Sequence, residues 1–385
     1  MQPLAARMGV TRVANVTGLD TLGLPVVAVY RPNARSIVVS QGKGLDLWAA
    51  KASGLMEAIE GFHAEHAALP LRLASARELA GTHELIDVAG LPRVSIGSFH
   101  LDRPILWCEA RELGSDRPLW VPYELVHTNF TLPLPAGSGY FTMSSNGLAS
   151  GNHVLEATSH GLCEVIERDA LALWDGAGGS GAARGRIAPD SIDDPHCTRV
   201  VAVIRAAGLA LGIWDITTDI GIATFACVLV DRHPNHVGQV YTSHGSGCHP
   251  SRGIALLRAL TEAAQTRLTF IAGTRDDADR AFFERARDPA RIERLRAELD
   301  APGEGRGFHA VPSRDSDDLE DDVRWQRARL AAAGLEQIAV VELTRPDVGI
   351  PVVRVIVPGL ESLHGIPGHV PGARARRAQA LREPA

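Results

Sequence analysis

Apolar residues recur at helical spacing in three long stretches of the chain, and shorter runs rich in valine and isoleucine lie between them. Apolar residues three or four positions apart predict a helix with one buried face, and short β-branched runs bounded by Gly, Pro or Asp predict strands. The predicted long helices are residues 45–66, 151–174 and 252–272.

The remaining predicted elements are shorter. Helices are predicted at residues 199–207 and 323–333. Strands are predicted at residues 24–30, 36–40, 104–113, 118–123, 209–216, 223–230, 237–242, 337–343 and 352–357. Irregular or partly helical segments are expected at residues 71–91, 131–138, 175–181, 274–322 and 359–372. This mixture indicates an α/β or α+β fold.

The composition is that of a globular protein: 385 residues, of which 45% are hydrophobic and 22% charged. A net charge of −6 argues against broad electrostatic binding of nucleic acid. There is no stretch of about 18 apolar residues and no N-terminal signal pattern, so we expect neither a membrane span nor a signal peptide. The five cysteines include no C-x-x-C pair, which excludes a zinc ribbon and fits a reducing cytoplasm.

Basic residues gather near the C-terminus, at Arg374, Arg376 and Arg377. Short charge runs are usually solvated. We therefore expect residues 374–385 to form a basic, flexible tail.

The most informative feature is a pattern shared by the three long helices. In each, an alanine lies seven positions before an acidic residue and a leucine lies two before it, and a glycine-bearing turn is predicted ahead of the helix. A second acidic or amide residue follows three positions later, on the same helix face. The three pairs are Glu57 with Glu60, Glu164 with Glu167, and Glu262 with Gln265.

A single such pair is usually a solvated helix face, but three pairs in otherwise apolar helices favour a shared site. Converging carboxylates repel one another, and a bound cation relieves that repulsion. Oxygen ligands select hard ions, and Mg²⁺ commonly shares its shell with substrate phosphates. Lys43, between Gly42 and Gly44, could reach such a phosphate. Neither a Walker A loop nor a G-x-G-x-x-G loop after a strand is present.

At these segments the chain resembles the YcaO family. The most specific match is the run Ser-Asn-Gly-Leu-Ala-Ser-Gly-Asn at residues 145–152, followed by Glu156-Ala157 and by Glu-Val-Ile-Glu-Arg at residues 164–168. The first long helix, with Ser53, and the third, followed by Arg275-Asp276-Asp277, match the family's opening and closing helices. The resemblance covers roughly residues 9–368.

The resemblance implies one α/β domain, residues 1–373, with an ATP site ringed by the three related helices. The residues that would hold Mg²⁺ are Glu57, Glu60, Glu164, Glu167 and Glu262. The residues that would contact the nucleotide are Lys43, Ser53, Asn152, Glu156, Arg168, Gln265 and Arg275.

Two departures from the family pattern bear on function. The first helix often reads E-x-x-E-R in the family, whereas Gly61 follows Glu60 here, so one cation near the phosphates is absent or comes from elsewhere. Azoline-forming relatives often end in a proline-alternating tail, and residues 382–385 do not follow that pattern. The opening Gly-Val-Thr-Arg at residues 9–12 and the run at residues 60–65 are more similar to the TfuA-associated branch, which is linked to thioamide formation.

The resemblance implies ATP-dependent phosphorylation of a backbone amide oxygen in a ribosomally made peptide or protein. Thioamidation with a separate TfuA-like partner is the expected reaction. Cyclodehydration of Cys, Ser or Thr to an azoline with a separate E1-like partner, a non-catalytic ATP-binding accessory role, and a purely structural metal remain open. No general base is assigned, because an ordinary packed histidine explains His63, His153, His160 and His244 equally well. A homodimer is expected on general grounds.

Overall fold

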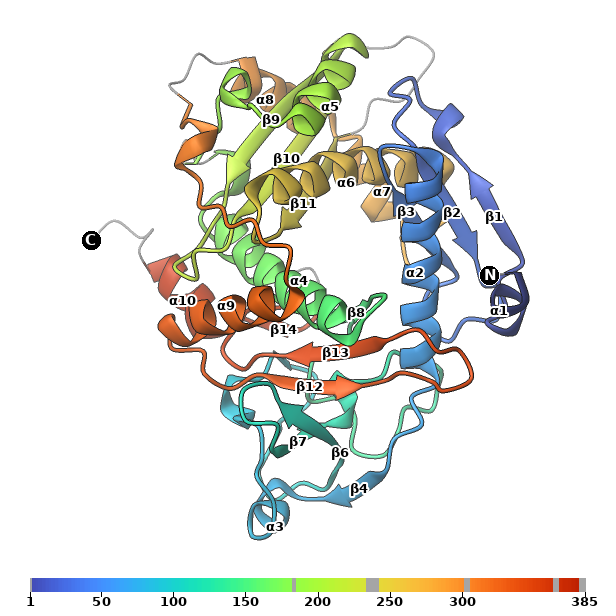
Figure 1. Ribbon diagram of the computed structural model, residues 1–385, viewed down its shortest axis with the longest axis vertical. Helices are drawn as coiled ribbons and strands as arrows, with labels where there is room; N and C mark the ends of the chain where they lie inside the picture. Colours follow the sequence, from blue (N-terminus) through green and yellow to red (C-terminus); the bar gives the residue numbers. More distant parts are fainter. Residues whose placement is uncertain (1, 182–184, 233–241, 301–304, 363–366, 381–385) are drawn as a thin grey trace. The chain divides into compact units, whose positions relative to one another are not determined.

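The computed structural model describes residues 2–181, 185–232, 242–300, 305–362 and 367–380 (Figure 1). The chain forms two compact units, each assembled from separate stretches of sequence. The first contains Met1–Asn33, Ile37–Ala58 and Gly178–Asp315; the second contains Ala34–Ser36, Ile59–Ala177 and Ser316–Ala385. Both mix helices with small antiparallel sheets, which confirms the mixed α/β class.

The first unit contains two three-stranded antiparallel sheets. One has the order β1 (Arg12–Asn15), β2 (Val26–Tyr30), β3 (Val39–Lys43), and the other has the order β11 (Ser243–Cys248), β10 (Thr224–Asp231), β9 (Leu209–Asp215). Its helices are α1 (Gln2–Arg7), the first part of α2 (Leu47–Glu65), α5 (Pro195–Ala206), α6 (Arg252–Ala272), α7 (Arg280–Ala286) and α8 (Pro289–Asp300).

The main core of this unit lies between the β9–β11 sheet and helices α5 and α6 (Figure 1). In the central strand β10, residues 225–230 form an unbroken apolar run, and the first seven residues of the strand are buried. This is expected for a strand covered on both faces.

Strands β3 and β11 lie unusually close to the helices that follow them. A methyl group on Gly42 would overlap the backbone of Ala50 and Gly54 in α2, and one on Gly245 would overlap the backbone of Ala259 in α6. Only glycine permits such close backbone approach. The sequence pattern predicts turns at these glycines, and that prediction was wrong, because here glycine serves strand-to-helix packing rather than chain reversal.

The second unit is built on a six-stranded antiparallel sheet. Its order is β4 (Leu71–Ala74), β6 (Ile105–Glu112), β12 (Ala339–Glu342), β13 (Val352–Ile356), β8 (Leu148–Ser150), with β7 (Pro118–Pro122) paired to β6. A two-stranded pair joins β5 (Arg93–Val94) to β14 (His369–Val370). The helices are the end of α2, α3 (Ala76–Ala80), α4 (Val154–Gly176), α9 (Leu319–Ala332) and α10 (Ala373–Ala380).

Helix α4 packs on strands β13 and β8, and α9 and α10 pack against α4 (Figure 1). Within the described ranges, no helix is both long and apolar enough to cross a membrane.

Most predicted helices and strands are confirmed, with ends shifted by a few residues. The strand predicted at residues 36–40 instead begins at Val39. Six strands of the structure were not predicted: β1, β4, β5, β8, β11 and β14. The strand predicted at residues 237–242 falls almost wholly outside the described residues.

The C-terminal segment was expected to be a flexible tail. Its described part is helix α10, and Arg374 Nε lies 3.0 Å from Asp169 Oδ1 in α4. Asp169 is fully buried. The basic segment is thus tied to α4 at its start, whereas residues 381–385 lie outside the described residues and the domain boundary at 373 stays a prediction.

Candidate carboxylate-lined nucleotide site

In the first unit, Lys43 is the residue that joins several of the predicted site residues. It ends strand β3, and its Nζ lies 2.8 Å from Glu262 Oε2 on α6. Its backbone N–H donates to Ser53 Oγ on α2 at 3.4 Å. The ammonium group of Lys43 therefore contacts a carboxylate of α6, while the backbone of the same residue contacts α2.

Glu262 is positioned by the strand that precedes its helix. Its Oε1 accepts hydrogen bonds from the backbone N–H of Ser246 at 3.3 Å and from the Ser246 hydroxyl at 3.2 Å. Ser246 lies in β11, between the two glycines that bring the strand close to α6. Close packing of strand and helix thus fixes the carboxylate.

The backbone of Gln41 in β3 connects α2 with α6. Its N–H donates to Glu57 Oε2 at 3.2 Å, and its carbonyl accepts from Gln265 Nε2 at 3.4 Å. Gln265 Oε1 is buried and has no hydrogen-bond partner within the described residues. A buried amide oxygen of this kind is suited to receive a donor or a cation.

Charged neighbours act on Glu57. Desolvation by surrounding protein atoms raises the pKa of Glu57, while Lys43, the Gln41 amide and Arg275 oppose this rise. The Glu57 side chain nevertheless reaches solvent, so it can exchange a proton or a cation. Arg275 Nε in turn donates to Asp277 at 2.7 Å. The first unit therefore brings together Lys43, Ser53, Glu57, Glu262, Gln265 and Arg275.

In the second unit, Glu60 near the end of α2 has the same relation to a strand serine. Its Oε1 accepts from the backbone N–H of Ser150 at 2.9 Å and from the Ser150 hydroxyl at 2.7 Å. Ser150 ends strand β8, immediately before the glycine turn that leads into α4.

The paired glutamates of α4 flank a cation. Arg168 lies 4.0 Å from a carboxylate oxygen of Glu164 and 4.0 Å from one of Glu167. Glu167 is buried, and Glu164 is half-buried. The two acidic groups of α4 thus lie on either side of one guanidinium.

Asn152 and Glu156 meet at the start of α4. The backbone N–H of Asn152 donates to Glu156 Oε2 at 2.8 Å, and Asn152 Nδ2 lies 3.1 Å from the same oxygen. The helix N-cap is His153, whose Nδ1 accepts from the Leu155 N–H. Both predicted residues therefore lie at a helix N-terminus, where anions are favoured.

The four histidines near the motifs have ordinary surroundings. His63 Nδ1 lies 2.7 Å from the Ile59 carbonyl, and His244 Nε2 lies 3.0 Å from Arg291. His153 is the N-cap of α4, and His160 lies half-buried on that helix. No general base is assigned to any of them.

The described part of the chain contains no group of three or more His, Cys, Asp or Glu side chains arranged to hold a metal by themselves. Mg²⁺ commonly takes one or two carboxylates and completes its shell with phosphate oxygens and water. Each unit by itself offers groups of this kind. The first has the carboxylates of Glu57 and Glu262, the Gln265 amide oxygen and the cations Lys43 and Arg275. The second has Glu164, Glu167 and Arg168. The fit is to a metal–nucleotide pair rather than to a metal alone.

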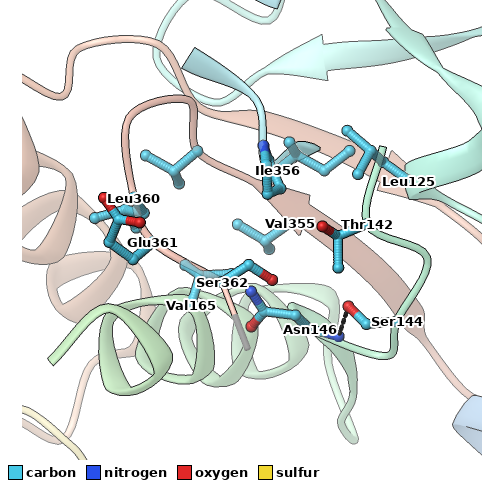
Figure 2. A pocket seen from close by; sticks show the side chains of 12 residues that line it. Leu125, Thr142, Ser144, Asn146, Val165, Val355, Ile356, Leu360, Glu361 and Ser362 are labelled. Carbon is cyan, nitrogen blue, oxygen red and sulfur yellow. Dashed lines mark hydrogen bonds between the residues drawn. The ribbon is translucent and has the colours of Figure 1, made fainter. Parts of the chain in front are cut away.

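A small cavity of about 40 Å³ lies in the second unit, between α4, β13 and the segment before β8 (Figure 2). Thr142 and Asn146 line it, and the Asn146 N–H donates to Ser144 Oγ at 3.3 Å. Thr142 Oγ1 and Asn146 Oδ1 are buried without a hydrogen-bond partner in the described ranges. The space suits a few water molecules and is too small for a nucleotide.

The sequence analysis missed four residues that organise these clusters: Gln41, Ser150, Ser246 and Arg354. Gln41 acts through its backbone, which leaves no side-chain signal. Ser150 precedes a glycine and Ser246 lies between two, a pattern that favours a turn. Arg354 could have been found, because it interrupts the apolar run Val-Val-Arg-Val-Ile of β13.

Comparison with known proteins places this geometry in context. Residues 41–361 match the YcaO cyclodehydratase family, described as binding ATP and Mg²⁺. An uncharacterized protein in the tfuA 3′ region of Rhizobium leguminosarum bv. trifolii is 39% identical, covering 94% of this chain and 86% of the relative.

Two solved structures share the fold. A heterocyclase in complex with substrate and cofactor matches with a TM-score of 0.75 and 25% identity, over 92% of this chain. This chain spans about half of that protein, 50% of its length. The YcaO protein of Methanopyrus kandleri, bound with AMPPCP and Mg²⁺, matches with a TM-score of 0.72 and 20% identity, over 96% of this chain and 92% of that one.

Proposed function

Because this chain belongs to the YcaO family, whose members bind ATP and Mg²⁺, we propose that it activates a backbone amide of a ribosomally made peptide or protein. The observation that supports this proposal most strongly is that two helix glutamates accept hydrogen bonds from strand serines: Glu60 from Ser150, and Glu262 from Ser246. Carboxylates held in this way are pre-organised for a cation.

We assign the chain's residues to two tasks. Glu57, Glu60, Glu164, Glu167 and Glu262 hold Mg²⁺. Lys43, Ser53, Asn152, Glu156, Arg168, Gln265 and Arg275 contact the nucleotide.

ATP with Mg²⁺ supplies the phosphoryl group that turns an amide oxygen into a leaving group. The protein's own contribution is positioning and charge compensation. Lys43 and Arg275 offset negative charge in one cluster, and Arg168 does so in the other.

We propose thioamidation as the reaction. Support comes from the relative encoded beside tfuA and from the run at residues 60–65, where Gly61 replaces the family's usual arginine. The partner would be a separate TfuA-like protein that supplies sulfur, and the expected homodimer stays a prediction.

The second candidate is azoline formation with a separate E1-like partner. It is favoured by the similarity to the heterocyclase that was solved with its substrate and cofactor. In this reaction a neighbouring Cys, Ser or Thr side chain is the nucleophile, so the product loses water. In thioamidation the product exchanges oxygen for sulfur.

The first test is calorimetry of the purified chain with ATP and Mg²⁺. We expect binding that requires Mg²⁺ and is lost in Glu164→Gln and Glu167→Gln. Glu320→Gln is the matched control, because Glu320 is an exposed glutamate of α9 paired with Arg324. Folded wild-type protein that does not bind nucleotide, alone or with a TfuA-like partner, would contradict the proposal.

The second test is mass spectrometry of a candidate peptide incubated with the chain, ATP, Mg²⁺ and each partner in turn. A mass change equal to exchange of oxygen for sulfur supports thioamidation. Loss of water supports the azoline route. Nucleotide binding without any change in peptide mass, with either partner, would favour an accessory role.

A further inference from the structure

Arg354 carries a buried charge and is not among the residues proposed above for the nucleotide site. It is the third residue of β13, is only 1% exposed, and lies opposite Leu148 of β8 in the strand ladder. Arginine is rarely buried to this degree unless an acidic partner is paired with it.

The guanidinium of Arg354 donates only to backbone carbonyls in the described part of the chain. It reaches Asn146 O at 2.7 Å, Ser144 O at 2.6 Å and Val126 O at 3.1 Å. These contacts satisfy its donors, but none of them cancels its charge. Burial accordingly lowers the pKa of Arg354 to about 10, and Glu164 of α4 acts in the opposite direction.

An uncancelled buried charge is costly and is retained only if nearby negative charge compensates it. The negative charge that acts on Arg354 is Glu164, on the helix face where Glu164 and Glu167 share Arg168. A second guanidinium therefore acts on Glu164 of α4 from inside the sheet.

The same guanidinium fixes a segment of backbone. Ser144 and Asn146 lead through Gly147 into β8 and then to Asn152 at the start of α4. Gly147 has a positive φ of 77°, and a methyl group there would overlap the Val355 carbonyl. The Arg354 hydrogen bonds tie the start of the family's most specific motif, residues 145–152, to β13, so their loss would loosen that start.

We propose that Arg354 is a positioning residue of the nucleotide site, holding the Ser144–Asn146 segment and supplying positive charge behind α4. This inference rests on the proposed function, since it assigns Arg354 to the same ATP–Mg²⁺ site. It predicts that the charge of residue 354 affects ATP affinity, and that its hydrogen bonds affect the stability of the Ser144–Asn146 segment.

The test compares Arg354→Lys, which keeps the charge but loses the planar fork, with Arg354→Gln, which keeps two donors but loses the charge. ATP affinity at saturating Mg²⁺ is measured by calorimetry. We expect Arg354→Gln to bind ATP about tenfold more weakly than wild type, which corresponds to the loss of one screened charge interaction. We expect the affinity of Arg354→Lys to stay within about threefold of wild type, because the charge is kept.

Hydrogen exchange, measured without nucleotide, follows the segment itself. Amides of residues 144–152 should exchange faster in both variants, because neither side chain reproduces the guanidinium hydrogen bonds to the three backbone carbonyls. Arg345→Gln is the control: Arg345 lies 3.2 Å from Asp347 on the chain leading into β13 and should change neither measurement.

Each outcome bears on a different claim. Folded wild-type protein that does not bind ATP with Mg²⁺, either alone or with a TfuA-like partner, overturns the proposed function and this inference with it. Wild-type binding together with unchanged binding by folded Arg354→Gln overturns the inference alone. So does an equal loss of affinity in both variants, which is the result for a purely structural arginine. If the glutamine variant does not fold, weak binding by folded Arg354→Lys overturns the charge role.

Discussion

Glu60 Oε1 accepts hydrogen bonds from both the backbone N–H and the hydroxyl of Ser150, at 2.9 and 2.7 Å. Glu262 makes the same pair of contacts with Ser246. In both cases a strand residue fixes a carboxylate oxygen of a neighbouring helix. The rotamer of the glutamate is therefore set before any ligand arrives, which lowers the entropy cost of binding one.

Removing either hydroxyl should loosen the glutamate that it holds. We expect Ser150→Ala and Ser246→Ala each to lower the free energy of unfolding by about 1 kcal/mol, the usual net worth of one hydrogen bond. ATP affinity should fall several-fold in each. Calorimetry and urea denaturation measure the two effects, and Ser115→Ala in the β6–β7 hairpin is the control. Affinity unchanged in both variants would show that the serines do not set the carboxylates.

The chain contains two lysines, and they provide a matched pair. Lys43 contacts Glu262, whereas Lys51 lies over the ring of exposed Trp48, 4.8 Å from its centroid. Lys43→Met should weaken ATP binding at least about tenfold, because positive charge beside the carboxylates is lost. Lys43→Arg should recover part of the affinity, and Lys51→Met should bind as wild type does. Equal behaviour of the two methionine variants in calorimetry would remove Lys43 from the site.

His127 should make stability depend on pH. Burial, and to a smaller extent Arg354, lowers the pKa of His127 from 6.5 to about 4. The unfolded chain then binds a proton that the folded chain does not, so the contribution to stability is complete above about pH 6.5 and is lost as pH falls toward 4.

In His127→Gln the loss of stability on acidification should be smaller by about 3 kcal/mol, since one pKa unit corresponds to about 1.4 kcal/mol. Thermal denaturation between pH 4 and 7 measures it. His100→Gln is the control, since that side chain is 69% exposed. A pH profile identical to that of wild type in His127→Gln would show that this histidine titrates normally in the folded chain.

The contact of α10 with α4 should contribute strongly to stability. Arg374→Met leaves Asp169 buried without its cation, and we expect a loss of about 3 kcal/mol. The double variant Asp169→Asn with Arg374→Met should recover most of that loss, because neither charge remains. Arg376→Met, on the same helix, is the control. Urea denaturation in which Arg374→Met matches wild type would support the free tail expected from the sequence.

Sequence periodicity was sufficient for the long helices and most apolar strands, because their burial pattern is strong. It was insufficient for β11, whose residues Ser-His-Gly-Ser-Gly-Cys have low strand propensity and pair only because α6 covers them. The spacing of glutamates indicated which side chains carry the site. It could not indicate Gln41 or Ser246, because their contributions depend on backbone positions set by tertiary packing.

The close packing of glycines against helix backbone also constrains how this protein can change. A residue without a side chain has no conservative replacement, so any substitution at Gly42, Gly245 or Gly247 would displace a helix axis. The acidic side chains could be exchanged one at a time with local effects. These three glycines are therefore the positions where substitution should be tolerated least, and a designed library should leave them unchanged.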